Sequence, residues 1–125
     1  MKDQRHSGRN QIVGKWGEDC ACAFLENKGF KLLARNVRTP AGEIDIIALD
    51  RETLVFIEVK ARLHNQAGYP EEAVTEEKLD HMFDSAEHWL ENHQEYKECW
   101  RLDVVAVTGM INSKNPQIEW FENAS

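Results

Sequence analysis

The chain has 125 residues, which is enough for one hydrophobic core and not for two. Apolar residues make up 42% and charged residues 30%, a balance that supports a packed core and excludes wholesale disorder. No uninterrupted apolar stretch approaches the roughly 20 residues of a membrane helix, and the polar N-terminus, Met1 to Asn10, has no secretion-signal core. The cysteines, Cys20, Cys22 and Cys99, match neither a zinc site nor a disulfide framework. We therefore expect a single soluble, reduced domain in the cytoplasm.

The charge of the chain limits how it can bind nucleic acid. The formal net charge is −7, with +2 over residues 1–62 and −9 over residues 63–125. A protein held on nucleic acid mainly by electrostatics is expected to be basic. We therefore expect any such contact to be local and to use the N-terminal half.

The first half of the chain predicts one helix followed by three strands. After a flexible tail over residues 1–10, apolar residues recur at spacings of three and four from Val13 to Phe24. This pattern is typical of an amphipathic helix, and Gly29 is a natural stop for it. Isoleucine-rich and alternating segments between short polar turns then predict strands over residues 30–38, 43–49 and 54–62.

The second half predicts another helix and two more strands. A loop over residues 63–73 comes first, and Thr75 can cap the helix that follows. The apolar face of this helix carries Leu79, Met82, Phe83, Ala86, Trp89 and Leu90. Residues 100–108 are the most continuously apolar and predict an interior strand, and residues 117–121 predict a short last one.

The expected element order is α-β-β-β-α-β-β. Three successive strands joined by short turns are antiparallel neighbours. The second helix allows a parallel, right-handed crossover between the third and fourth strands. We therefore predict an α/β fold, with helices packed on a mixed five-stranded sheet, in one domain over residues 11–125.

Acidic residues and a lysine fall at matching positions on the second and third predicted strands. Alternation places Glu58, Lys60 and Arg62 on one face of their strand. If Leu49 pairs with Leu54 across the turn, Asp45 lies opposite Glu58, and Glu43 lies opposite Lys60. Like charges that face each other destabilise a sheet, so two acids at facing positions need a compensating reason to be there.

A divalent metal ion is one such reason. Mg²⁺ is typically held by one or two carboxylates together with water and substrate phosphate, so Asp45 and Glu58 are candidate ligands. Lys60 is placed to orient an attacking water or to stabilise developing charge. Glu18 flanks the apolar stripe of the first helix, where it can supply a third carboxylate. The alternative is a solvated cross-strand network in which Glu43 pairs with Lys60 and Asp45 with an arginine.

The sequence resembles a known family over most of its length. The matching segments are Gly14-Lys15-Trp16-Gly17-Glu18, Arg35-Asn36-x-Arg38, Gly42-Glu43-Ile44-Asp45, Val55-Phe56-Ile57-Glu58-Val59-Lys60, Glu72-Ala73-Val74 with Lys78, Arg101-Leu102-Asp103-Val104-Val105 and Glu122-Asn123-Ala124. These motifs look like those of the YraN-like family of small bacterial proteins. That family is grouped with the restriction-endonuclease-like, PD-(D/E)xK nucleases and is compared with Holliday-junction resolvases.

The resemblance implies a three-layer α/β/α fold and a phosphodiesterase site. It implies a metal site at Asp45 and Glu58, with Lys60 as the catalytic lysine and Glu18 as the helix carboxylate. The resemblance includes Glu43 as part of the motif Gly42-Glu43-Ile44-Asp45, but it assigns no role to this residue. Such chains often have Lys-x-x-Arg on the second helix; this one has Lys78 followed by His81, which weakens a phosphate-binding role at position 81 only.

Other polar residues have two interpretations each. Arg35, Arg38 and Arg62 are candidate phosphate contacts or ordinary surface charges. Lys78 either contacts substrate or extends along the apolar face of its helix. Asp103 lies in an otherwise apolar strand, so we expect it to pair with Arg101 or with a backbone amide.

Two main functions follow. The first is a nuclease that depends on Mg²⁺ or Mn²⁺ and hydrolyses phosphodiester bonds in DNA, with branched or structured DNA among the candidate substrates. The second is a nucleic-acid-binding or assembly protein that keeps the fold and has lost efficient chemistry. A purely structural interaction domain is a third interpretation, and a homodimer is a candidate assembly.

Overall fold

The computed structural model describes residues 4–64 and 75–124, and its elements follow the expected order. The elements are α1 (Gln4–Asn27), β1 (Lys31–Thr39), β2 (Gly42–Asp50), β3 (Thr53–Leu63), α2 (Glu76–Leu90), a 3₁₀ helix (Gln94–Tyr96), β4 (Trp100–Gly109) and β5 (Gln117–Phe121). The predicted loop from residue 65 onward, and with it the motif Glu72-Ala73-Val74, lies outside the described residues. Among the helices described, none is long and apolar enough to cross a membrane.

Helix α1 begins earlier than expected and ends at the predicted stop. It starts at Gln4, within the expected tail, because extending an established helix adds one backbone hydrogen bond for each further residue. At the other end Gly29 adopts a φ of +96°. The amides of Gly29 and Phe30 donate to the carbonyls of Glu26 and Leu25, each at 3.0 Å. This is the Schellman arrangement, which glycine favours because it lacks a Cβ.

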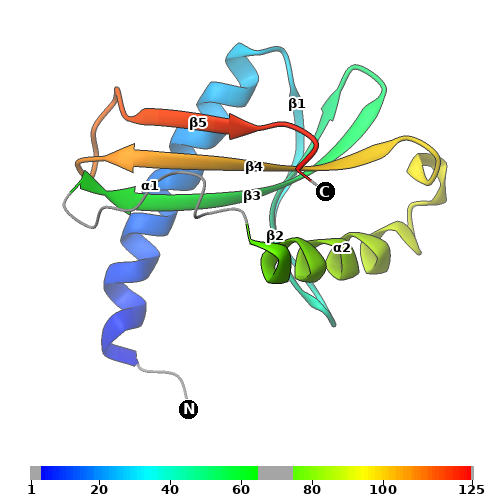
Figure 1. The fold of residues 1–125 in the computed structure, drawn as a ribbon, viewed down its shortest axis with the longest axis horizontal. Helices are drawn as coiled ribbons and strands as arrows, with labels where there is room; N and C mark the ends of the chain where they lie inside the picture. The colour runs from blue at the N-terminus through cyan, green and yellow to red at the C-terminus, as the bar shows by residue number, and fades with distance from the viewer. Residues whose placement is uncertain (1–3, 65–74, 125) are drawn as a thin grey trace.

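The five strands form one mixed sheet in the order β1-β2-β3-β4-β5 (Figure 1). Strands β3 and β4 pair in parallel, and the other neighbours pair antiparallel. The chain passes from β3 to β4 through α2, where the Thr75 side chain accepts a hydrogen bond of 3.2 Å from the backbone amide of Lys78. The expected sheet, its parallel crossover and the capping residue are confirmed.

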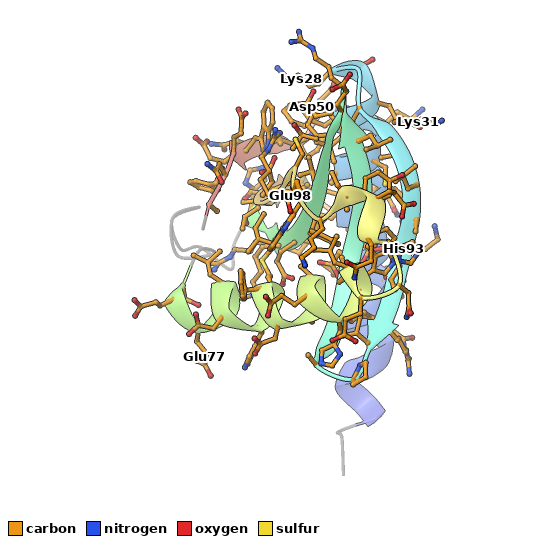
Figure 2. All side chains as sticks on the ribbon, turned by 90° about the vertical axis from the view of Figure 1, so that its right-hand side faces the viewer. Lys28, Lys31, Asp50, Glu77, His93 and Glu98 are labelled. Atoms are coloured by element: carbon orange, nitrogen blue, oxygen red, sulfur yellow. The ribbon has the colours of Figure 1, made fainter. Side chains whose placement is uncertain are left out.

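The two helices cover opposite faces of the sheet and produce three layers, α/β/α (Figure 1). On the face that we name the α1 face, the helix packs on Ile46, Ala48, Val55, Ile57, Val105 and Val107. On the α2 face, the other helix packs on Ile44, Ile47, Leu54, Phe56, Leu102, Val104 and Ala106. Figure 2 places Asp50 near Lys28 and Lys31 at one end of the molecule, away from Glu77 at the start of α2.

Candidate functional site

The β2–β3 hairpin has the predicted register but a shorter ladder than expected. Leu49 pairs with Leu54, and pairing continues to Ile46 with Ile57, one step before Asp45 and Glu58. Beyond that point the Asp45 side chain takes part in the contact between the strands. Its Oδ2 accepts a hydrogen bond of 2.8 Å from the backbone amide of Val59.

The side-chain alternation of β2 breaks at Asp45. Ile46 belongs to the α1 face, whereas both Ile44 and Ile47 belong to the α2 face. On the neighbouring strand β1, Asn36 adopts a φ of +53°, a left-handed conformation that asparagine tolerates better than most residues. The strands therefore change direction together here, and the Asp45 carboxylate turns toward β3.

The other two members of the predicted motif lie on the α2 face of β3. Leu54 and Phe56 pack on this face, so alternation places Glu58 and Lys60 there as well. Glu58 Oε2 lies 3.2 Å from the Lys78 ammonium, which comes from the first turn of α2. The sequence did not predict this ion pair; it left Lys78 either as a substrate contact or as a side chain that extends along the apolar face of its helix.

The pKa of the Asp45 carboxyl is strongly raised. Burial, followed by the charge of Glu58, raises the pKa of Asp45 from 3.8 to about 7. The Val59 amide opposes this rise, and the charges of Glu18 and Glu43 add to it. The Asp45 carboxylate is thus bonded to the amide of the residue that follows Glu58, and the charge of Glu58 adds to the rise in its pKa.

Lys60 is also shifted toward its neutral form. Burial lowers the pKa of its ammonium, and the neighbouring charges of Lys78 and Arg62 lower it further, while Glu58 opposes them. Two lysines, an arginine and two carboxylates thus share a small region around the end of the β2–β3 ladder.

Glu18 reaches this region because α1 lies unusually close to the sheet. A Cβ added at Gly17 would lie 2.5 Å from the Ala61 Cβ, so only glycine permits this approach. The Glu18 side chain is 15% exposed, and its Oε1 lies 3.4 Å from Nη2 of Arg35 on β1. The same Nη2 lies 2.9 Å from Asp19 Oδ1. Arg35, predicted as a phosphate contact or a surface charge, is bound to helix carboxylates.

Glu43 does not lie opposite Lys60 as predicted. It pairs in the β1–β2 ladder with Arg38, and the Arg38 Nε atom lies 3.8 Å from Glu43 Oε2. The prediction was wrong because β2 bends at Asp45 and leaves β3. Arg38 itself is 89% exposed, whereas Arg62 of β3 lies next to Thr108 of β4.

The acidic residues form a pair with neighbours and not a complete metal cage. Within residues 4–64 and 75–124, no group of three or more His, Cys, Asp or Glu side chains is arranged to hold a metal ion. One or two carboxylates, completed by water and phosphate, are nevertheless the usual protein contribution to a Mg²⁺ site.

Asp103 has a separate, structural role, as predicted. Its buried carboxylate accepts hydrogen bonds from the Arg101 guanidinium at 3.0 and 3.2 Å and from Trp120 Nε1 at 2.9 Å. The backbone amide of Asn123 donates a further bond of 2.9 Å. The group ties β4 to β5 and to the chain after it.

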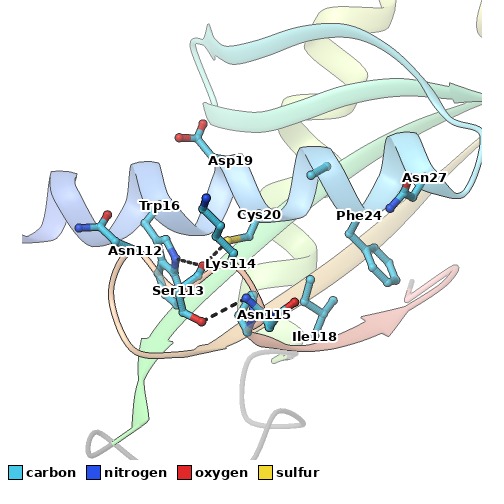
Figure 3. Close-up of a pocket in the computed structure, with 12 residues that line it drawn as sticks. Trp16, Asp19, Cys20, Phe24, Asn27, Asn112, Ser113, Lys114, Asn115 and Ile118 are labelled. Atoms are coloured by element: carbon cyan, nitrogen blue, oxygen red, sulfur yellow. Dashed lines mark hydrogen bonds between the residues drawn. The ribbon is translucent and has the colours of Figure 1, made fainter.

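A cavity of about 610 Å³ lies between α1 and the loop that joins β4 to β5 (Figure 3). Its wall includes Trp16, whose Nε1 donates to the Ser113 carbonyl at 3.1 Å. Asp19 lines the same cavity and also contacts Arg35. Asp45, Glu58 and Lys60 are not among the lining residues, so this cavity is distinct from the carboxylate region.

Two residues of the region were missed by the sequence interpretation. Asn36 adopts a left-handed conformation in β1, next to the site. The sequence signal for it was the asparagine itself, within Arg35-Asn36-x-Arg38, because asparagine tolerates this conformation better than most residues. Val59 acts through its backbone amide, for which no residue type is diagnostic.

Fold and site together define a small α/β/α domain with a carboxylate pair and a lysine where two central strands separate. The chain belongs to the family described as "Uncharacterised protein family UPF0102", whose model matches residues 17–107. A UPF0102 protein of Geobacter metallireducens is 40% identical over 115 residues, covering 92% of this chain and 93% of that protein. Another, of Cytophaga hutchinsonii, is 46% identical over 97 residues, covering 74% and 81%. The expected YraN-like membership is thereby supported.

Proposed function

We propose that the protein is a metal-dependent endonuclease that hydrolyses phosphodiester bonds in DNA, including branched or structured DNA. The observation that carries the proposal is the position of Asp45, which accepts a hydrogen bond from the amide of the residue after Glu58. Burial, and then the charge of Glu58, raises the pKa of this carboxyl to about 7. Such repulsion is costly to a fold and is relieved by a bound cation. The same three residues, Asp45, Glu58 and Lys60, form the motif that resembles the PD-(D/E)xK nucleases.

The residues present fit Mg²⁺ or Mn²⁺ in their donor chemistry. Asp45 and Glu58 offer carboxylate oxygens, which hard divalent cations prefer over nitrogen and sulfur. The Val59 amide engages Asp45 Oδ2 and so orients the carboxylate. A bound ion would polarise the phosphodiester as a Lewis acid.

The chain's own groups have distinct roles in this proposal. Asp45 and Glu58 hold the cation, and Glu18 adds a third negative charge from α1. Lys60 lies on the same face as Glu58, two residues away, where it orients the attacking water or stabilises the charge that develops on phosphate. Its lowered pKa follows from burial and from neighbouring cations.

The nucleic acid is bound locally, because the chain as a whole carries a charge of −7. Lys60 and Arg62 share the α2 face of β3, and Lys78 approaches that face from α2. These cations form a small basic area beside the carboxylates. They are the candidate phosphate contacts, together with the exposed Arg38.

A specific observation favours the second candidate, a nucleic-acid-binding or assembly protein without efficient chemistry. The Lys78 ammonium already neutralises Glu58 at 3.2 Å. If this ion pair persists in solution with millimolar metal, the acids are balanced internally and no cation is needed. This alternative predicts binding of nucleic acid without cleavage.

The deciding experiment incubates purified protein with labelled linear, flapped and four-way DNA, with Mg²⁺, Mn²⁺ or EDTA. We expect cleavage with metal only, its loss in Asp45→Asn and Glu58→Gln, and a strongly reduced rate in Lys60→Ala. Glu52→Gln is the matched control, because it makes the same chemical change at an exposed turn position. Cleavage that persists in Asp45→Asn belongs to a contaminant or to another site, and the assignment then fails.

A further inference from the structure

The side chain of Arg35 is bound to carboxylates of α1, so it is not available as a phosphate contact. It extends from β1 to α1, where one nitrogen, Nη2, donates to both Asp19 Oδ1 at 2.9 Å and Glu18 Oε1 at 3.4 Å. Asp19 is itself held by the Lys15 ammonium at 3.0 Å. The guanidinium is therefore anchored to the helix on one side and to a strand of the sheet on the other.

Glu18 is bound to Arg35 and lies on the part of α1 that approaches β3 next to Asp45. Gly17, the residue before it, lies against Ala61 and Val59 of β3, and the Val59 amide donates to Asp45 Oδ2 at 2.8 Å. The charge of Glu18 also adds to the raised pKa of Asp45. Because the Glu18 side chain is only 15% exposed, it needs a partner that compensates for lost water. Arg35 supplies that partner and also restricts where the carboxylate can point.

The backbone around Arg35 supports the same role. Arg35 pairs in the sheet with Ile46, the residue that follows Asp45, and the left-handed Asn36 comes directly after it. The position of the guanidinium is thus tied to the bend that turns Asp45 toward β3. On the helix side, the close approach at Gly17 limits the distance between α1 and the sheet.

We propose that Arg35 is a positioning residue that holds Glu18 of α1 near Asp45, so that the negative charge of Glu18 strengthens the attraction of Asp45 and Glu58 for a cation. This inference rests on the proposed function, because it assigns a cation to the site. It separates Arg35 from Arg38, whose side chain is 89% exposed and lies 3.8 Å from Glu43 and not against α1 carboxylates.

The inference is testable because the two roles of Arg35 predict opposite changes in cation affinity when the residue is removed. Removing a positive charge near a cation site should tighten cation binding, if charge alone matters. Removing a positioning residue should weaken binding, because Glu18 is then free to turn toward solvent. Outer partners of metal ligands typically contribute about 10- to 100-fold in affinity.

The experiment measures Mn²⁺ affinity by isothermal titration calorimetry without nucleic acid. The proteins are wild type, Arg35→Ala, Arg35→Lys, Glu18→Gln, the double variant Glu18→Gln/Arg35→Ala, and Lys31→Ala. Lys31 is an exposed residue of the same strand, and its substitution is the control of equal charge. We expect about tenfold weaker binding in Arg35→Ala and in Glu18→Gln. The double variant should bind no more weakly than Glu18→Gln, Arg35→Lys should recover part of the loss, and Lys31→Ala should bind as the wild type does.

The possible failures are distinguishable. If the wild type binds no Mn²⁺, the proposed function fails, and the inference fails with it. If the wild type binds Mn²⁺ and Arg35→Ala binds equally well or more tightly, only the positioning role is overturned. Circular dichroism checks folding, and Arg35→Gln replaces Arg35→Ala in the same comparison if the alanine variant does not fold.

A second readout tests the competing role of Arg35 as a phosphate contact. Binding of labelled DNA is measured in EDTA over a range of salt concentrations. A positioning residue leaves the affinity and the salt dependence unchanged. A phosphate contact would weaken binding and reduce the salt slope by about one, which would overturn the inference.

Discussion

The Lys78 ammonium of α2 lies 3.2 Å from Glu58 Oε2 of β3, which places a cation of the chain itself at the proposed metal-binding carboxylates. Both side chains are partly buried, at 32% and 22% exposed. Thr75 caps the helix turn that carries Lys78, so the backbone that presents the ammonium is well defined. The same lysine contributes to lowering the pKa of Lys60.

In the proposed site, Lys78 and a divalent ion would therefore compete for Glu58. We predict that Lys78→Gln raises Mn²⁺ affinity about fivefold, because a half-buried ion pair is worth on the order of 1 kcal/mol. Lys97→Gln, an exposed lysine in the connection before β4, measures the general effect of losing one charge. If calorimetric titrations give the same Mn²⁺ affinity for both variants, the Lys78–Glu58 ion pair does not lower the affinity of the site for the cation.

The raised pKa of Asp45 predicts how stability depends on pH without metal. The unfolded chain loses this proton near pH 3.8 and the folded chain near pH 7, so the folded state holds more protons between these values. The free energy of unfolding should therefore fall as pH rises from about 4 to about 7. Asp45→Asn removes this slope and should stabilise the protein above pH 7 by roughly 2–4 kcal/mol.

Urea unfolding at a series of pH values in EDTA measures this effect. The quantity of interest is the difference between Asp45→Asn and wild type, which cancels the other titrating groups. Asp84→Asn, an exposed aspartate on α2, is the control. Parallel pH profiles for wild type and Asp45→Asn would contradict the electrostatic description of the site.

The close contact of α1 with β3 predicts opposite effects for two glycines of the same helix. Gly17→Ala should destabilise the protein by about 1–3 kcal/mol, because the new Cβ would lie 2.5 Å from the Ala61 Cβ. Gly14→Ala has open space around its Cβ and should stabilise by about 0.5–1 kcal/mol through helix propensity. Thermal unfolding gives both values.

The rescue variant Gly17→Ala/Ala61→Gly sharpens this test. It removes the clashing methyl group and should recover most of the stability that Gly17→Ala loses. If Gly17→Ala is as stable as Gly14→Ala, the helix does not approach the sheet as closely as described. Glu18 would then lie further from Asp45 as well.

The network around Asp103 predicts loss of stability without loss of cation binding. Asp103→Ala should cost about 3–5 kcal/mol, since it leaves the Arg101 guanidinium and Trp120 Nε1 without their buried partner. The milder Trp120→Phe removes one hydrogen bond and should cost about 1 kcal/mol. Chemical unfolding measures both, and Trp120→Phe should keep wild-type Mn²⁺ affinity. A weakened affinity would tie this network to the site.

Short-range patterns in the sequence determined much of the fold. The three-to-four spacing from Val13 to Phe24 and the stop at Gly29 predicted the body and end of α1, because helix periodicity and capping are local. The turn after Leu49 predicted the β2–β3 register, because a short turn leaves few ways to pair two strands. The partner of Asp103 was predicted because a carboxylate in an apolar strand must be neutralised.

Tertiary structure alone decided how the side chains of the site meet. The bend at Asp45, the Arg35–Glu18 contact and the Lys78–Glu58 ion pair each join segments that are separate in sequence. Their geometry depends on where α1 and α2 sit on the sheet, and this is set by the fit of whole apolar faces against each other. The sequence therefore determined which residues could form the proposed site, and helix packing decided which of them touch.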